Sequence, residues 1–364
     1  MKQRNVGIDI LRIVSMIFII IVHLLMQGGA LSAYLNQGLQ VGYYFLNIVY
    51  VLAYCGVNCF ALVSGYVGWQ STFRIEKIIN LWANVIFWSV GVSLILFVYN
   101  NELFSLKEAV SMFLPILRGR YWFFNAYFVM FMFSPLLNHL IKTLPKRTFQ
   151  YFLSAVAVVF CVIPFLALGN DIFRMQSGFE FPWLMVMYLV GGYFSKYPVT
   201  IKKTYKCIVA FFGFALFNFI FKYLIELITT KLLGSASHGD IFLSFTSPVA
   251  VGEAVSLLLF FSNLKINNIK LMKFISLITP SVFSVYIIHV HPLVFWRILK
   301  NAFIGLTEYN LLVSFVLIIA ISVAIFVCCI ALDFIRIMIF KFLRINKLCD
   351  KLGNNISNLF EKVV

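Results

Sequence analysis

The chain has 364 residues, of which 62% are hydrophobic and only 12% are charged, and its mean hydropathy is +0.96. This composition excludes a soluble globular protein, which needs more polar surface, and predicts a multi-span membrane protein. Basic loops that set the membrane topology and attract anionic lipid explain the formal net charge of +16, so we do not expect nucleic-acid binding.

The predicted spans are the apolar runs, because a membrane-spanning helix needs about 20 mostly apolar residues. In chain order the runs lie at about 8–27, 41–63, 78–99, 121–141, 149–169, 181–194, 206–229, 241–262, 276–298 and 311–340. We therefore predict an all-α, polytopic membrane helix bundle of about ten transmembrane helices. The longest loops, near 28–40, 100–120 and 230–240, have room only for a re-entrant segment or a short surface helix.

Lysine and arginine are concentrated in alternate loops, as expected when cytoplasmic loops retain positive charge. With a cytoplasmic N-terminus every second loop fits this rule, so we expect both termini on the cytoplasmic side. The inner segments then contain these cations: Lys2 and Arg4; Arg74 and Lys77; Lys142, Lys146 and Arg147; Lys196, Lys202, Lys203 and Lys206; Lys265, Lys270 and Lys273; and Arg336, Lys341, Arg344, Lys347 and Lys351.

The first apolar run carries Arg12 near its start and His23 near its end. Eleven positions are about three helical turns, so both side chains leave one face of the helix, roughly 16 Å apart along its axis. Ionisable residues inside a span are functional-site candidates because their burial is costly. Asp9 precedes Arg12 by three residues, so we expect an ion pair that holds the guanidinium; a purely structural pair at the membrane edge is the alternative.

Arg118 and Arg120 are exceptions among the cation-poor outer loops, and they lie just before the fourth run. One interpretation has them bind lipid phosphate while Tyr121 and Trp122 form an interfacial aromatic belt. The other has them line an outward-facing mouth for a sugar or an anionic glycan, where Trp122 stacks on a sugar ring.

His289 in the ninth run lies at the same predicted depth as His23, so the two histidines could face one cavity, with Tyr286 nearby. A satisfied packing histidine is the alternative. We interpret His291, which Pro292 follows, as an interfacial residue. Glu253, in the middle of the eighth run, is costly unless paired or solvated, and we expect it to orient a histidine or line the acceptor path.

Several functional classes have no support in the sequence. Six of the seven cysteines lie within apolar runs, which excludes a secreted disulfide framework and favours packing at helix interfaces. Walker, dinucleotide-binding and HExxH motifs are absent from the sequence. We therefore expect no metal and no tightly bound cofactor.

Four segments together resemble the acyltransferase-3 family of bacterial membrane proteins. The opening NVGIDILRIVSMIFIIIVH (5–23) is similar to a first span with Asp, Leu-Arg and then His, here Asp9, Arg12 and His23. The segments GVNCFALVSGYVG (56–68), WFFNAYF (122–128) and SVFSVYIIHVHP (281–292) resemble later motifs of the family, in the expected order. Two positions depart from the pattern: Glu76 stands where another cation is common, and Phe124 where leucine is usual.

The resemblance implies a membrane enzyme of about ten spans that moves an acyl group, commonly acetyl from acetyl-CoA, to a hydroxyl of a surface polysaccharide or another glycan. It places the protein in the bacterial plasma membrane, with acyl-CoA, the glycan acceptor and the lipid bilayer as partners; assembly into homo-oligomers is left open. We expect residues 1–340 to form one transmembrane acyltransferase domain and residues 341–364 a short basic cytoplasmic tail, folded as an amphipathic surface helix. The chain contains no extracellular esterase-like domain of the kind that some members carry, so transfer is expected from the membrane domain itself or with a separate partner.

Acyl transfer requires a base for the hydroxyl proton and a group that stabilises the oxyanion. His23 is our candidate base, because the unperturbed pKa of histidine suits this task. The further catalytic candidates are Asp9, Arg12 and His289.

The donor and acceptor are expected at opposite ends of the bundle. We expect the CoA phosphates at the inner mouth, with the phosphopantetheine arm extending to His23. The predicted donor-binding residues are Arg12, Arg74 and Lys77. The predicted acceptor-side residues are Arg118, Arg120, Trp122, Glu253 and Tyr286.

Two other classes compete with acyl transfer. A flippase, exporter or polymerase for lipid-linked oligosaccharide would also have many spans and outward-facing arginines, but not the Asp-x-x-Arg face that ends in His. A solute transporter predicts inverted repeats and matching broken helices, and the sequence shows no convincing repeat.

Overall fold

The computed structural model describes residues 4–234 and 239–363, and this part of the chain consists of helices and loops without a strand. The predicted all-α class is thus confirmed. Lys2, one of the predicted inner cations, lies outside the described residues, as does the 235–238 part of one long loop.

The α-helices of the first half are α1 (Val6–Leu25), α2 (Ala30–Asn36), α3 (Val41–Tyr54), α4 (Gly56–Gly68), α5 (Ile75–Tyr99), α6 (Leu106–Phe113), α7 (Trp122–Met132), α8 (Ser134–Thr143), α9 (Lys146–Ala157) and α10 (Ile163–Leu166). Those of the second half are α11 (Phe181–Lys196), α12 (Tyr205–Leu233), α13 (Pro248–Ser262), α14 (Ile269–Ile278), α15 (Val282–His289), α16 (Leu311–Phe342) and α17 (Ile345–Val363). Two π-helical segments, Val158–Val162 and Val294–Leu299, interrupt this pattern.

Each of the ten predicted spans has a helical counterpart, but they differ in length. Within the described residues, seven segments are long and apolar enough to cross a membrane. An eighth, α7 with α8, is bent by 55°. The runs at 181–194 and 241–262 form α11 and α13, which have only 16 and 15 residues. Seven or eight of the predicted runs therefore have the length of a full span within the described residues, and the other two form the shorter helices α11 and α13.

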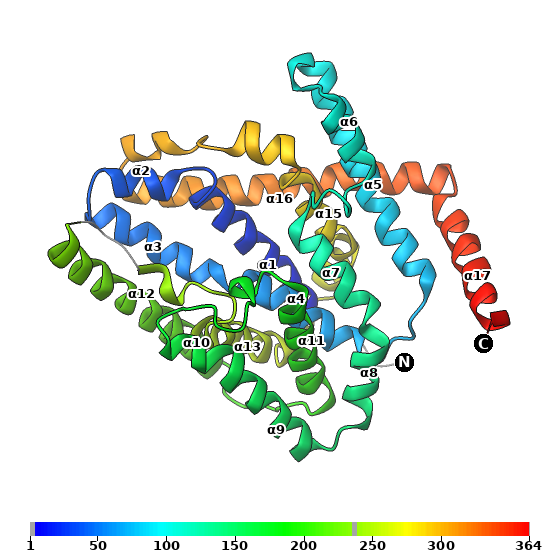
Figure 1. The fold of residues 1–364 in the computed structure, drawn as a ribbon, viewed down its shortest axis with the longest axis horizontal. Helices are drawn as coiled ribbons and strands as arrows, with labels where there is room; N and C mark the ends of the chain where they lie inside the picture. Colours follow the sequence, from blue (N-terminus) through cyan, green and yellow to red (C-terminus); the bar gives the residue numbers. More distant parts are fainter. Residues whose placement is uncertain (1–3, 235–238, 364) are drawn as a thin grey trace.

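Helix α1 occupies the centre of the bundle and packs against α3, α4, α13, α15 and α16. Figure 1 shows it between α16 on one side and α4 and α13 on the other. Asn5 caps its start by accepting a hydrogen bond from the backbone N–H of Ile8. Buried Leu11, Ile20 and Leu24 form part of its core-facing surface. The arginine and histidine of this helix are therefore held by a central element of the fold.

Helices α4 and α11 form an especially close pair. A Cβ atom on Gly65 would overlap the backbone carbonyl of Tyr188, and one on Gly191 would overlap that of Leu62. Small residues let helix backbones approach in a membrane, where apolar burial alone does not drive association. These two glycines set the distance between the helices.

The span before α16 is broken where the histidines lie. Helices α14 and α15 are separated by a 3₁₀ turn that contains Pro280, and α15 ends at His289. Pro292 follows, and the chain continues as the π-helical segment Val294–Leu299. A proline has no backbone N–H to donate, which explains an ended helix at this point.

The loops and the tail carry short helices. Helices α2 and α6 occupy the long loops near 28–40 and 100–120, as predicted. The tail forms α17, which packs beside α5 (Figure 1). Its Gly353 lies directly against Glu76. The basic tail is therefore attached to the start of α5.

Candidate active site

Two histidines from distant parts of the chain meet inside the bundle. Nδ1 of His23 on α1 lies 3.0 Å from Nε2 of His289, the last residue of α15. Phe295 packs edge-on against His23, with ring centroids 5.1 Å apart. The end of α15 thus brings His289 to the last turn of α1.

The hydrogen bonds of this pair define which nitrogen atoms carry protons. Nδ1 of His289 lies 2.7 Å from the carbonyl oxygen of Val285, which can only accept, so Nδ1 carries the proton. A neutral His289 then presents Nε2 as an acceptor for the proton on Nδ1 of His23. Nε2 of His23 is left unprotonated. This is the tautomer that a general base requires.

A cavity of about 390 Å³ lies beside the two histidines. It is lined by α1, α15, the π-helical segment with the turn after it, and α16. Among the described lining residues, His23 and His289 are the only ones with a nitrogen or oxygen atom in the side chain. The candidate base therefore faces an almost wholly apolar space.

At the opposite end of α1, Asp9 pairs with Arg4, and not with Arg12 as we expected. Nε of Arg4 lies 2.5 Å from the Asp9 carboxylate. No carboxylate in residues 4–234 or 239–363 forms an ion pair with Arg12. The reason is that the chain before α1 brings Arg4 within reach of Asp9, whereas Arg12 faces a cavity.

This inner cavity has a volume of about 380 Å³ and is lined by Arg4, Asp9 and Arg12, together with residues from the ends of α4 and α11. It shares no lining residue with the cavity at His23. Ser15, Met16 and Ile19, which lie between the two cavities on α1, are buried. An extended arm that reached from one cavity to the other would have to pass this packed stretch.

The other two predicted donor residues lie elsewhere. Arg74 lines a cavity of about 690 Å³ between the start of α5, the α7–α8 bend and α17. Lys77 is half-buried one turn further along α5 and is not among the residues that line this cavity. Neither residue shares a cavity with Arg12.

The predicted acceptor-side residues do not gather in one mouth. Arg118 is exposed. Trp122 packs against Phe179 and Phe245, with centroid distances of 4.7 and 6.2 Å. The hydroxyl of Tyr286 accepts a hydrogen bond from the backbone N–H of Phe123 at 3.2 Å, which joins α15 to the start of α7.

Glu253 is fully buried on α13, and neither of its carboxylate oxygens has a hydrogen-bond partner among the described residues. It therefore contacts neither histidine through a hydrogen bond.

Arg120 is buried, which differs from the outward-facing position that we expected. Its Nη1 lies 2.6 Å from Glu108 of α6, and its Nη2 lies 2.8 Å from Nε2 of His291 and 3.0 Å from Oγ of Ser93. The interpretation of His291 as interfacial was wrong, because this side chain is fully buried. Arg120 ties α6 to the segment that follows His289.

The chain was compared with known families, curated proteins and solved structures. The profile of the "Acyltransferase domain" family matches residues 5–333, which include Arg12, His23 and His289. The chain belongs to the acyltransferase-3 family. The predicted resemblance is thereby confirmed, and the protein is a multi-pass membrane acyltransferase. Neither the comparison with curated proteins nor the one with solved structures gave a match.

Two ion pairs inside apolar helices of this acyltransferase were not predicted from the sequence. On α12, Nζ of Lys222 lies 2.8 Å from Glu226, which also accepts a hydrogen bond from the Tyr43 hydroxyl at 2.8 Å. On α16, Nε of Arg336 lies 2.6 Å from Asp333. Opposite charges three or four residues apart within an apolar run are the sequence signal that could have identified both pairs.

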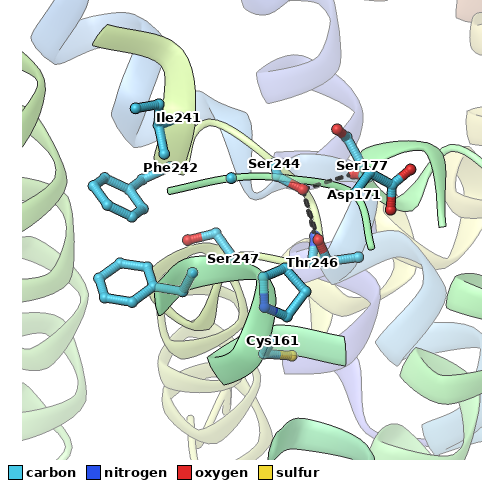
Figure 2. Close-up of a pocket in the computed structure, with 11 residues that line it drawn as sticks. Cys161, Asp171, Ser177, Ile241, Phe242, Ser244, Thr246 and Ser247 are labelled. Atoms are coloured by element: carbon cyan, nitrogen blue, oxygen red, sulfur yellow. Dashed lines mark hydrogen bonds between the residues drawn. The ribbon is translucent and has the colours of Figure 1, made fainter. Parts of the chain in front are cut away.

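A small polar pocket at the ends of α10 and α13 is unsuited to an acyl substrate (Figure 2). Its volume of about 20 Å³ is roughly that of one water molecule. Oγ of Ser244 donates to the carbonyl of Ser177 at 3.0 Å and lies 2.7 Å from Oγ1 of Thr246. Asp171 accepts from the backbone N–H of Gln176 at 2.6 Å. These bonds fasten two loops of the acyltransferase together.

The described residues contain no group of three or more His, Cys, Asp or Glu side chains with the geometry of a metal site. The two imidazoles form a pair with each other instead. An imidazole pair of this kind can transfer a proton at the His23 cavity.

Proposed function

We propose that this acyltransferase moves an acyl group, acetyl or another short acyl, from cytosolic acyl-CoA to a hydroxyl of a cell-surface glycan, in the bacterial plasma membrane. The observation that supports this proposal is the His23–His289 hydrogen bond, which leaves Nε2 of His23 unprotonated beside a cavity. In the proposed reaction Nε2 takes the proton of the acceptor hydroxyl while the hydroxyl oxygen attacks the thioester carbonyl. The C–S bond then breaks, and the CoA thiolate takes the proton back from His23.

The proposed donor site is the inner cavity with Arg4 and Arg12. Two guanidinium groups at a membrane edge are suited to phosphate groups, to which arginine binds in a bidentate manner. The rise along α1 from Arg12 to His23 is roughly 16 Å, comparable to an extended phosphopantetheine arm. Passage of that arm requires the side chains around Met16 to move apart.

The test is transfer of radiolabel from acyl-CoA to a glycan extract by purified protein in lipid nanodiscs, starting with acetyl-CoA. We expect His23→Ala to lower transfer by about 10²–10⁴-fold, the usual contribution of a general base. His139→Ala is the matched control, because His139 is exposed on α8 and lies outside the cavities described above. We expect it to retain wild-type transfer.

The donor assignment has its own test. Arg12→Ala is expected to raise KM for acyl-CoA more than it lowers kcat, and Lys231→Ala to change neither, because Lys231 is exposed near the end of α12 and lines none of the cavities described above. Wild-type transfer by His23→Ala would contradict the base assignment. If folded wild-type protein transferred no acyl group from any acyl-CoA donor, this result would favour glycan export or polymerisation without acyl transfer.

A further inference from the structure

The side chains that line the cavity beside His23 suit a ligand other than a sugar. A hydroxyl-rich ligand needs hydrogen-bond partners when it leaves water, and each missing partner costs free energy. The walls of this cavity offer only the two imidazoles, and every other lining side chain is aliphatic, aromatic or a thiol. The chemistry of the walls therefore selects an apolar group.

The opening of the cavity also points to an apolar ligand. Its floor is buried Ile20, Leu24 and His289, whereas Ile298 and Cys328 at its rim are exposed. Cys328 lies 17 residues after the start of α16, roughly 26 Å along a helix of roughly 48 Å. The rim is thus near the middle of the longest span, where the surroundings are lipid hydrocarbon.

The size of the cavity exceeds the needs of an acetyl group. A cavity of about 150 Å³ lined by similar side chains holds benzene, a molecule of six carbons. At the same volume per carbon, a cavity of about 390 Å³ has room for a chain of roughly 15 carbons. An acetyl group has a single methyl beyond its carbonyl and would leave most of this space unfilled.

We propose that this cavity binds the alkyl chain of the donor's acyl group, and that the preferred acyl group is longer than acetyl, with a chain of about eight to fifteen carbons. The inference rests on the proposed function, in which the thioester carbonyl lies beside Nε2 of His23. The carbonyl then stays at the base, and the chain extends from it between α1, α15 and α16. The acceptor hydroxyl approaches on the other side of the carbonyl.

The first experiment measures kcat/KM for saturated acyl-CoA donors from two to sixteen carbons, with purified protein in nanodiscs and a glycan extract. We expect about a fourfold increase for each added methylene until the cavity is filled, because each buried methylene contributes a transfer free energy of this size. Ile325→Trp, which fills the cavity from α16, should lower the octanoyl-to-acetyl ratio of kcat/KM by at least tenfold. Val323→Trp is the matched control on the exposed face of the same helix and should leave the ratio unchanged. Ile325→Ala enlarges the cavity and should shift the chain length with the highest kcat/KM to a longer chain. This variant provides the test if Ile325→Trp does not fold.

The second experiment needs no turnover. Cys328 is the exposed cysteine of the described chain, and it lines the cavity, so its alkylation by N-ethylmaleimide reports occupancy. We expect octanoyl-CoA, but not acetyl-CoA or CoA, to slow this alkylation.

The two experiments separate failure of the inference from failure of the proposed function. His23-dependent acetyl transfer with no gain for longer chains and no protection of Cys328 would overturn the inference and leave the function intact. Protection by octanoyl-CoA without transfer of any acyl group would support the cavity assignment and overturn the function. Protection by nanodisc lipid alone, or by a polyprenyl-linked acceptor alone, would assign the cavity to a lipid tail and overturn the inference.

Discussion

At the scale of single residues, His289 determines what His23 can do. Its Nε2 accepts a hydrogen bond from Nδ1–H of His23 at 3.0 Å and thereby keeps Nε2 of His23 free of a proton. We expect His289→Ala to lower kcat by about 10–100-fold, the range found when an orienting partner of an imidazole is removed. KM for both substrates should change little. His289→Gln should restore part of the activity, because its amide oxygen can accept the same hydrogen bond.

Steady-state kinetics on folded, monodisperse variants measure this effect. A purely structural role for His289 would lower the yield of folded protein but leave the kcat of the folded fraction unchanged. Equal kcat values for His289→Ala and wild type would therefore contradict the positioning role.

Arg118 and Arg120 are two residues apart, yet we expect opposite responses to substitution. Arg120→Ala removes the ion-pair partner of Glu108 and one hydrogen-bond partner of His291, and it should destabilise the folded state by about 1–3 kcal/mol. Arg118→Ala removes an exposed side chain and should change stability by less than about 0.5 kcal/mol. Thermal unfolding of both variants in the same detergent measures the difference. Equal melting temperatures would show that the buried contacts of Arg120 do not stabilise the fold.

The single-residue contacts were only partly predictable from the sequence. His23 and His289 could be placed at one depth, because each position follows from its distance along an apolar run. The ion-pair partner of Asp9 could not be predicted, because the helical spacing rule compares residues within one helix and Arg4 lies before α1 begins. Burial of Arg120 depends on Glu108 and His291, which come from two other segments of the chain.

At the scale of helices, the contact between α4 and α11 depends on two glycines. Gly65→Ala or Gly191→Ala would force the backbones apart, at a cost of about 1–3 kcal/mol or more for an overpacked contact. We expect a lower yield of monodisperse protein in size-exclusion chromatography. Gly213→Ala on α12 is the control, because its Cβ would meet no atom within 4 Å. If the Gly213→Ala control also lost folded protein, the lower yield of the other two variants would result from changed helix flexibility and not from packing.

Helix positions were more predictable than helix interruptions. Every apolar run became a helix, because run length and apolar content act locally. The 55° bend between α7 and α8 and the end of α15 at His289 were not predicted. A proline lies near each of these places, Pro135 near the bend and Pro292 after the end of α15. A proline permits a bend, but the packing of neighbouring helices decides whether the two halves still cross as one span.

At the scale of the whole molecule, the distribution of charge predicts the orientation on which the reaction depends. With both termini cytoplasmic, α1 runs outward, so Arg12 lies near the cytoplasmic face and His23 in the outer half of the membrane. An inverted protein would present the arginines of the inner cavity to the cell exterior, where acyl-CoA is absent. Orientation is therefore a condition for the proposed function, and it can be tested without any substrate.

The test of orientation is cysteine labelling in whole cells with a membrane-impermeant maleimide. Arg118 and Lys203 are both exposed and lie in loops that the charge pattern assigns to opposite sides. We expect Arg118→Cys to be labelled in intact cells, and Lys203→Cys only after the membrane is permeabilised. The wild-type chain provides the background, since its cysteines are buried apart from Cys328, which lies far inside the longest span. The reverse pattern would invert the topology and exclude a cytosolic donor at Arg12, whereas labelling of both variants in intact cells would contradict a loop on each side of the membrane.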